Sequence, residues 1–181
     1  YPWLLADVGT IDILGNVGAG AAYAATVWGL RKTPYIGVQP VNHPGVEPIK
    51  STWRGTNGRP SWAWNECDGN EAVVEVYADA TEIELLLNGN SLGKKTVEEY
   101  KTIFTIDYSP GTLTAVAFDD NENEIGRSEL QSASGEMKVN LTLEETSVAA
   151  GEIVYVDVSI MGENDVVEMN ADKKLTVVVE N

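Results

Sequence analysis

The chain contains the sequence EAVVEVYADATEIELLLNGNSLGKK at positions 71–95. Its two apolar runs, 73–77 and 83–87, are rich in aliphatic residues and alternate in part with polar ones. This pattern is typical of strands that place one face in a core. Asn88-Gly89 then predicts a tight hairpin turn, because both residues accept the positive φ that such a turn demands. The stretch therefore predicts antiparallel β-structure.

Further strand signals follow the hairpin at short intervals. Apolar runs of strand length lie at 103–108, 112–118 and 125–130, and turn-forming residues separate them. We therefore predict about six short strands between residues 71 and 135, the signature of an immunoglobulin-like antiparallel β-sandwich. The expected fold class is mainly β.

Residues 136–181 start a new series of strand signals. Apolar runs lie at 139–143, 153–160 and 175–180, with a weaker one at 166–169. The segment is shorter than the roughly 100 residues that a complete sandwich of this class needs. We predict a second, incomplete β-sandwich module, with its boundary near the sequence SASG at 132–135.

The N-terminal third differs from the rest. Residues 18–30 form the one convincing helix candidate, which we expect Pro34 to end. Five prolines and several glycines between residues 34 and 60 then predict an extended linker at 36–67, in which Tyr35–Gln39 could be one strand. Because its tryptophans would be costly to leave in water, we expect this linker to lie along a surface. A lone helix within 1–35 suggests the remnant of another domain.

Composition and charge exclude several classes of protein. The chain has 181 residues and a net charge of −16. Residues 1–65 carry three acidic and five basic side chains, whereas residues 66–181 carry 25 acidic and seven basic ones. The acidic part would repel nucleic acid and anionic membranes, and no apolar run reaches the length of about 18 residues that spans a bilayer. We expect neither kind of partner.

The N-terminus and the metal-binding residue types give little further information about processing, disulfides or metal sites. The first residues, YPWLL, lack the pattern of a signal peptide, and the chain looks cut from something longer. One cysteine, Cys67, and one histidine, His43, give neither an internal disulfide nor a usual zinc site. We expect no metal and no cofactor, and the compartment is not indicated.

Several stretches together resemble the C-terminal part of a bacterial glycoside hydrolase family 2 enzyme of the β-galactosidase type. They are GTIDILG at 9–15 with the helix that ends in Val27-Trp28, PYIGVQP at 34–40, SWAW at 61–64, VEVY at 74–77, EIEL at 82–85, LNGNSLGKK at 87–95 and YSPGTLTAVA at 108–117. The resemblance runs across nearly the whole chain, and LNGNSLGKK is its most specific part.

The resemblance implies a division of the chain and a role for it. Residues 1–35 would close a catalytic (β/α)8 barrel, 36–67 would link it to the sandwich at 68–135, and 136–181 would follow as the incomplete module. The family's two catalytic glutamates would lie upstream, so we expect no catalytic residue here. We expect the fragment to be inactive, and a longer parent to be a glycoside hydrolase whose barrel packs against it and binds the carbohydrate.

Asn65-Glu66 resembles the Asn-Glu pair that carries the family's general acid. Glycoside hydrolysis needs two carboxyl groups on a rigid scaffold, about 5–10 Å apart. Glu66 follows the barrel remnant and precedes the first sandwich strand, so a turn is the favoured interpretation. DDNENE at 119–124 echoes the start of a calcium loop but lacks its later glycine and glutamate, which favours a hairpin turn.

Four residues are candidates for substrate binding. Asp12 could face the sugar pocket of an intact enzyme, or it could be a solvated carboxylate at the start of a helix. Trp53, Trp62 and Trp64 could form a platform for sugar stacking. They could equally wedge the barrel remnant onto the sandwich, which we favour.

Two other functions remain open from the sequence. The chain could be an independent carbohydrate-binding module that uses its tryptophans, or an adhesin-like structural array of β-sandwiches. Our first hypothesis is a non-catalytic accessory region of a family 2 glycoside hydrolase.

Overall fold

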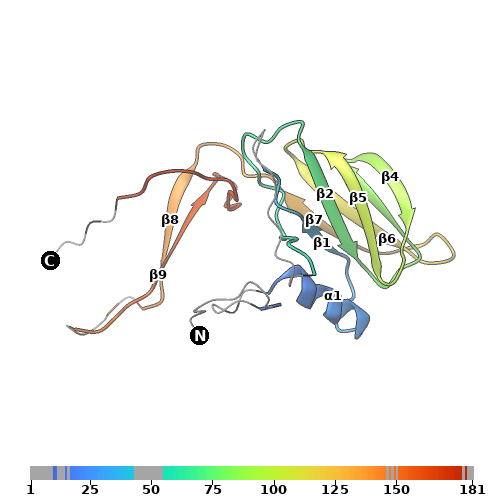
Figure 1. Ribbon diagram of the computed structural model, residues 1–181, viewed down its shortest axis with the longest axis horizontal. Coiled ribbons are helices and arrows are strands. Elements are labelled where there is room, and N and C mark those ends of the chain that lie inside the picture. The colour runs from blue at the N-terminus through green and yellow to red at the C-terminus, as the bar shows by residue number, and fades with distance from the viewer. Residues whose placement is uncertain are drawn as a thin grey trace.

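The structure is a computed structural model that describes residues 10–11, 15, 17–42, 55–145, 147, 149, 151–176 and 178 (Figure 1). Within these residues it has one helix and nine strands: α1 (Ala19–Val27), β1 (Tyr35–Val38), β2 (Glu71–Tyr77), β3 (Glu82–Leu87), β4 (Asn90–Thr96), β5 (Lys101–Asp107), β6 (Thr112–Phe118), β7 (Glu124–Gln131), β8 (Lys138–Leu143) and β9 (Val156–Met161). In the described part of the chain, no helix is long and apolar enough to cross a membrane.

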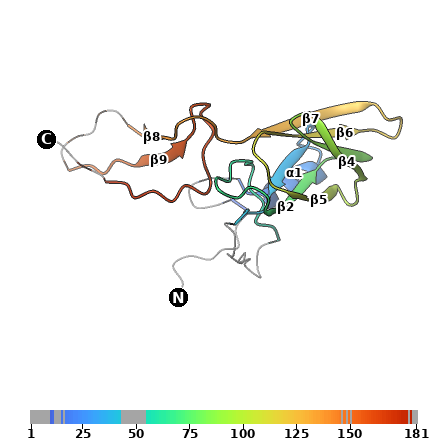
Figure 2. The same cartoon turned by 90° about the horizontal axis from the view of Figure 1, so that it is seen from above.

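Strands β1 to β7 form two antiparallel sheets. One has the order β1-β2-β5 and the other the order β4-β3-β6-β7. Seen from above, they lie as two layers (Figure 2). The six strands predicted between residues 71 and 135 are confirmed as β2 to β7, and the arrangement is consistent with an immunoglobulin-like sandwich.

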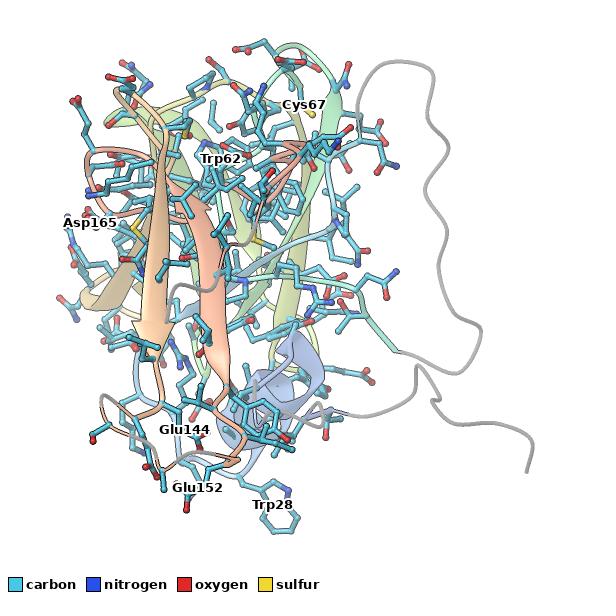
Figure 3. The ribbon with its side chains drawn as sticks, turned by 90° about the vertical axis from the view of Figure 1, so that its left-hand side faces the viewer. Trp28, Trp62, Cys67, Glu144, Glu152 and Asp165 are labelled. Carbon is cyan, nitrogen blue, oxygen red and sulfur yellow. The ribbon has the colours of Figure 1, made fainter. Side chains whose placement is uncertain are left out.

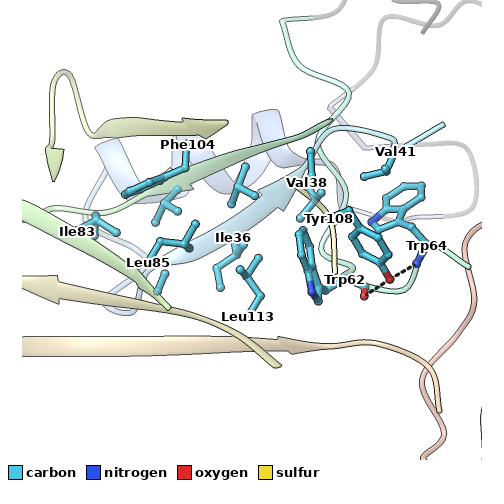
Figure 4. Packing of buried hydrophobic residues seen from close by; sticks show 14 of the residues in the cluster. Ile36, Val38, Val41, Trp62, Trp64, Ile83, Leu85, Phe104, Tyr108 and Leu113 are labelled. Atoms are coloured by element: carbon cyan, nitrogen blue, oxygen red, sulfur yellow. Dashed lines mark hydrogen bonds between the residues drawn. The ribbon is translucent and has the colours of Figure 1, made fainter. Parts of the chain in front are cut away.

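The predicted alternation places the core between the two sheets. Val74 and Val76 of β2 face Ile83 and Leu85 of β3, and all four side chains are fully buried. Figure 4 shows how these layers pack with further residues, including Ile36, Val38, Phe104, Leu113 and Tyr108. Burial of each such aliphatic side chain contributes about 1.5–3 kcal/mol, so this core is the main source of stability.

The β3–β4 hairpin turns at Asn88-Gly89 as predicted. The two residues have φ values of 52° and 78°. The Asn88 side chain also accepts a hydrogen bond from the Thr112 amide at 2.9 Å and donates one to the Pro110 carbonyl at 3.3 Å. The turn is therefore tied to the neighbouring β5–β6 connection, which the hairpin signal alone does not predict.

Helix α1 is confirmed, but it ends earlier than Pro34. Its last residue is Val27, and Gly29 adopts a φ of 67°. The Leu30 amide then donates to the Ala25 carbonyl at 2.8 Å. A left-handed glycine that lets the next amide cap the last turn is a common helix end, and it stops this helix before the proline can.

The segment predicted as a linker supplies part of the sandwich. Tyr35–Val38 forms β1, which pairs with β2 along its full length. Trp62, Trp64 and Cys67 are buried in the core cluster. The possible strand at 35–39 is confirmed as β1. The sandwich therefore begins before residue 68, because pairing and burial recruit parts of the predicted linker.

Strands β8 and β9 form a separate two-stranded ribbon that extends away from the sandwich (Figure 1). The aliphatic residues of the two strands alternate with polar ones and are paired with each other across the ribbon. One face therefore carries only aliphatic side chains: Val139, Leu141, Leu143, Val156, Val158 and Ile160. Leu141 is 61% exposed. The predicted strand at 175–180 lies partly outside the described residues.

Candidate functional site

A cluster of three tyrosines, one from α1 and one each from the outer face of β1 and β2, holds the helix against the sandwich. Tyr35 and Tyr77 are paired across the two strands, and their rings stack with centroids 5.7 Å apart. Tyr23 of α1 meets the Tyr77 ring edge-on at 5.3 Å. Such pairs contribute about 0.5–1.5 kcal/mol beyond their buried area, so the tyrosine cluster fixes the helix in place.

A buried carboxylate lies beside the tyrosine cluster. Glu75 is 6% exposed and accepts hydrogen bonds from the Tyr77 hydroxyl and the Gln39 amide. Gln39 also donates to Thr56 at 3.3 Å. Burial, followed by the hydrogen bond to Glu75, raises the pKa of Tyr77 well above its usual range, so this hydroxyl keeps its proton.

Tyr35 contrasts with its stacked neighbour. Its hydroxyl is buried and finds no hydrogen-bond partner among the described residues. The Arg31 guanidinium lies 5.2 Å from the centre of the Tyr35 ring, a distance suited to a cation–π contact. Burial is the main cause that raises the pKa of Tyr35.

The end of α1 exposes apolar side chains. Trp28 is 79% exposed, Leu30 is 80% exposed and Val27 is 40% exposed. Figure 3 shows Trp28 projecting away from the sheets. We call these three residues the helix-end patch. Since isolated exposed tryptophans are costly in water, the patch has the composition of a surface that another folded unit covers.

Two of the predicted sugar-binding residues, Trp62 and Trp64, lie within the described part of the chain, and both are buried. Trp62 is fully buried and Trp64 is 3% exposed. Trp62 packs on Tyr108 with ring centroids 4.7 Å apart, and the Tyr108 hydroxyl accepts from the Trp64 amide at 3.1 Å (Figure 4). Neither indole offers a ring face to a sugar, and both belong to the core cluster of the sandwich. Whether they also hold residues 1–35 onto the sandwich stays a prediction. Asp12 and Trp53 lie outside the described residues.

The two acidic sequence motifs form turns. Glu66 is exposed in a turn before β2 and has a φ of 61°. Asp119 closes the β6–β7 turn by accepting from the amides of Asn121 and Asn123 at 2.9 and 2.8 Å. The side-chain amide of Asn123, followed by these backbone amides, holds the pKa of Asp119 below its usual value. Within the described residues, no group of three or more His, Cys, Asp or Glu side chains could hold a metal ion.

Sequence reasoning missed the partners of Glu75. The alternation in 73–77 places Glu75 and Tyr77 on the face opposite Val74 and Val76, as the structure shows. That face would be exposed in an isolated sandwich. It is buried because α1 and residues 56–59 cover it. The helix at 18–30 was predicted from the sequence, but its position over this face of the sheet was not.

A comparison with protein families matched residues 69–126 to a family described as "Domain of unknown function (DUF4982)". No curated protein matched the chain. The matched family covers β2 to β6 and the start of β7, which is the centre of the sandwich.

Solved structures resemble the chain over most of its length. A glycosyl hydrolase family 2 member from Bacteroides cellulosilyticus has a TM-score of 0.68 and 24% identity, covering 92% of this chain and 23% of its own. A β-glycosidase from Bacteroides vulgatus has a TM-score of 0.57 and 22% identity, covering 88% of this chain and 18% of its own. A β-glucuronidase from glycoside hydrolase family 2 has a TM-score of 0.57 and 16% identity, covering 90% of this chain and 15% of its own.

These likenesses show the fold. The chain spans less than a quarter of the length of each of these solved structures. It therefore has the fold of a segment found within much longer proteins of glycoside hydrolase family 2, and the resemblance stated from the sequence is confirmed at this level.

Proposed function

We propose that this chain is a non-catalytic accessory region of a family 2 glycoside hydrolase of the β-galactosidase type, which packs against the catalytic barrel. One observation carries the proposal. Helix α1 is bound to the sandwich through the tyrosine cluster, while its end exposes Trp28 and Leu30. The helix thus has one partner in the sandwich and an apolar patch left for a second, which the resemblance identifies as the barrel.

The described carboxylates support a non-catalytic role. Glu75 is buried against Tyr77 and Gln39, and Glu168 is 8% exposed and accepts from two backbone amides. Glu66 is exposed in a turn. Glycoside hydrolysis needs a pair of carboxyl groups that flank a bound sugar. Glu66 and Glu168 line one small pocket, but Glu168, like Glu75, already accepts two hydrogen bonds from within the protein.

Hydrolysis of nitrophenyl β-galactoside and β-glucuronide tests the non-catalytic role. The purified 181-residue chain should release no nitrophenol above the rate of buffer, while a longer chain that includes a catalytic barrel should hydrolyse a glycoside. Turnover by the 181-residue chain that the substitution Glu66→Gln abolishes would overturn the proposal.

A sugar titration separates this proposal from an independent carbohydrate-binding module. Because Trp62 and Trp64 are buried, millimolar galactoside should leave the tryptophan emission unchanged. The variant Trp28→Ala serves as the matched control, since it removes an exposed indole and leaves the buried pair intact. A saturable shift in emission that survives in Trp28→Ala would favour the binding module instead.

A further inference from the structure

The segment after β9 returns to the sandwich and binds it at two places. At the first place, the Glu163 amide donates to the Ser134 carbonyl at 2.8 Å, and Asn164 bonds to Ser134 and Ser132 at 3.1 and 2.9 Å. At the second, the Met169 amide donates to the Ala63 carbonyl at 3.0 Å. Residues 163–170 therefore connect the ribbon to strand ends of the sandwich.

Glu168 lies at the centre of the second place. Its side chain is 8% exposed, and its Oε1 accepts from the amides of Asn65 and Asn170, both at 2.9 Å. One carboxylate thus joins the turn before β2 to the segment after β9, 103 positions later. Hydrogen bonds to a charged group are roughly twice as strong as neutral ones, so the bond from Asn65 to Glu168 is expected to be the strongest single polar contact between the segment and the sandwich.

Asn170 extends the link to the core. Its side-chain amide donates to the Val41 carbonyl at 3.0 Å and contacts Cys67 Sγ at 2.9 Å. Cys67 is fully buried, and burial is the main cause that raises the pKa of its thiol. Its position at one end of the sandwich is labelled in Figure 3. Asn170 therefore covers a thiol that can report on whether the segment stays in place.

Apolar packing contributes less to this contact. A groove of about 470 Å³ runs between the segment and the end of β7, lined by residues that include Pro60, Leu130, Val166 and Met169. Met169 remains 41% exposed. Because the facing apolar side chains do not close over each other, the hydrogen bonds of Glu168, Met169 and Asn170 carry the attachment.

We propose that residues 163–170 act as a clasp that holds the β8–β9 ribbon in one orientation, with Glu168 as its positioning residue. The clasp opens as a local unit, without unfolding of the sandwich, when the Glu168 bonds are lost. It thereby determines the direction in which the aliphatic face of the ribbon points. Local opening of this kind is common where few apolar contacts support a segment.

The reactivity of Cys67 under native conditions tests the clasp. A small water-soluble thiol reagent should react slowly with the wild-type chain and at least about tenfold faster with Glu168→Gln, because a neutral amide replaces the charged acceptor of two hydrogen bonds. Asn170→Ala should also accelerate the reaction. The charge of Glu168 raises the pKa of the Cys67 thiol, whereas the Asn170 hydrogen bond lowers it, so a faster reaction of Asn170→Ala reports exposure of the thiol and not a lower pKa. Glu163→Gln is the matched control, because that side chain is exposed on the same segment, and it should react as the wild type does.

Two further measurements separate clasp opening from unfolding. The free energy of unfolding, measured in urea, should fall by less than the value that corresponds to the faster Cys67 reaction. The backbone amides of Asn65 and Asn170 should exchange with solvent faster in Glu168→Gln than in the wild type. Unchanged Cys67 reactivity in both Glu168→Gln and Asn170→Ala would overturn the proposal. The proposal would also be overturned if the reaction rate of Cys67 rose by the same factor as the equilibrium constant for global unfolding, because the sandwich and the segment would then open together.

Discussion

The hydroxyl of Tyr77 donates a hydrogen bond to the carboxylate of Glu75, two positions earlier on β2. Both residues occupy the outer face of their sheet, yet both are buried, because α1 covers them. The bond places a charged group beneath a helix that also carries the helix-end patch. Because Tyr77 also contacts Tyr23 of α1, the bond to Glu75 helps to keep the helix attached.

A pair of single substitutions tests the importance of this bond. Tyr77→Phe removes one of the two donors to the buried Glu75 carboxylate and should lower the free energy of unfolding by about 1–3 kcal/mol. Tyr35→Phe is the matched control. It removes a buried hydroxyl that has no partner among the described residues, so it should be neutral or slightly stabilising.

Urea unfolding of the three proteins measures both effects. Equal destabilisation by the two substitutions would contradict the importance of the Glu75 bond, because both variants keep the ring and lose only the hydroxyl.

Stability should fall as the pH rises above 10. Burial raises the pKa values of Tyr35, Tyr77 and Tyr108 above the ordinary value of 10.0. Below pH 10 these phenols are protonated in both the folded and the unfolded chain. Above it, the unfolded chain loses the protons first, which favours unfolding. Urea unfolding at increasing pH measures the loss, and Tyr77→Phe should make it shallower.

The exposed Tyr155 provides the control for this pH dependence. It is 72% exposed, so Tyr155→Phe should leave the alkaline loss of stability as it is in the wild type. A loss that Tyr155→Phe reduces as much as Tyr77→Phe would contradict the assignment to buried phenols.

Gly111 should tolerate no side chain. It has a φ of 143°, and a Cβ at this position would collide with the Asn88 side chain that ties the β3–β4 turn to Thr112. Gly111→Ala should therefore destabilise the chain by more than Gly69→Ala, which meets only the strain of a φ of 78° and no atom within 4 Å. That strain costs about 1–3 kcal/mol.

Thermal unfolding compares the two alanine variants. The double substitution Asn88→Ala with Gly111→Ala should recover part of the loss, because it removes the atoms that collide. A cost at Gly69 equal to that at Gly111 would show that backbone strain alone decides both.

The sequence was a good guide to local structure. The alternation in 73–77 and 83–87 predicts which side chains of β2 and β3 face the core, and Asn88-Gly89 predicts the turn between β3 and β4. These features depend on neighbours in the chain, so a local pattern is enough to reveal them.

Contacts between distant residues were not predictable in this way. The pairing of β1 with β2, the burial of Trp62 beside Tyr108 and the bond from Asn65 to Glu168 all join positions far apart in the chain. The sequence allowed a strand at 35–39 and favoured packing of Trp62, but a local pattern does not identify the partner of either. The partners of Glu75 were missed for the same reason.

Oxidative footprinting of Trp28 tests the central claim most directly. Hydroxyl radicals should modify Trp28 rapidly in the 181-residue chain, where it is 79% exposed, and slowly in a longer chain that includes a catalytic barrel. Trp62, which is fully buried, should be protected in both and provides the internal control. Equal modification of Trp28 in the two proteins would contradict the claim that the helix-end patch packs against a barrel.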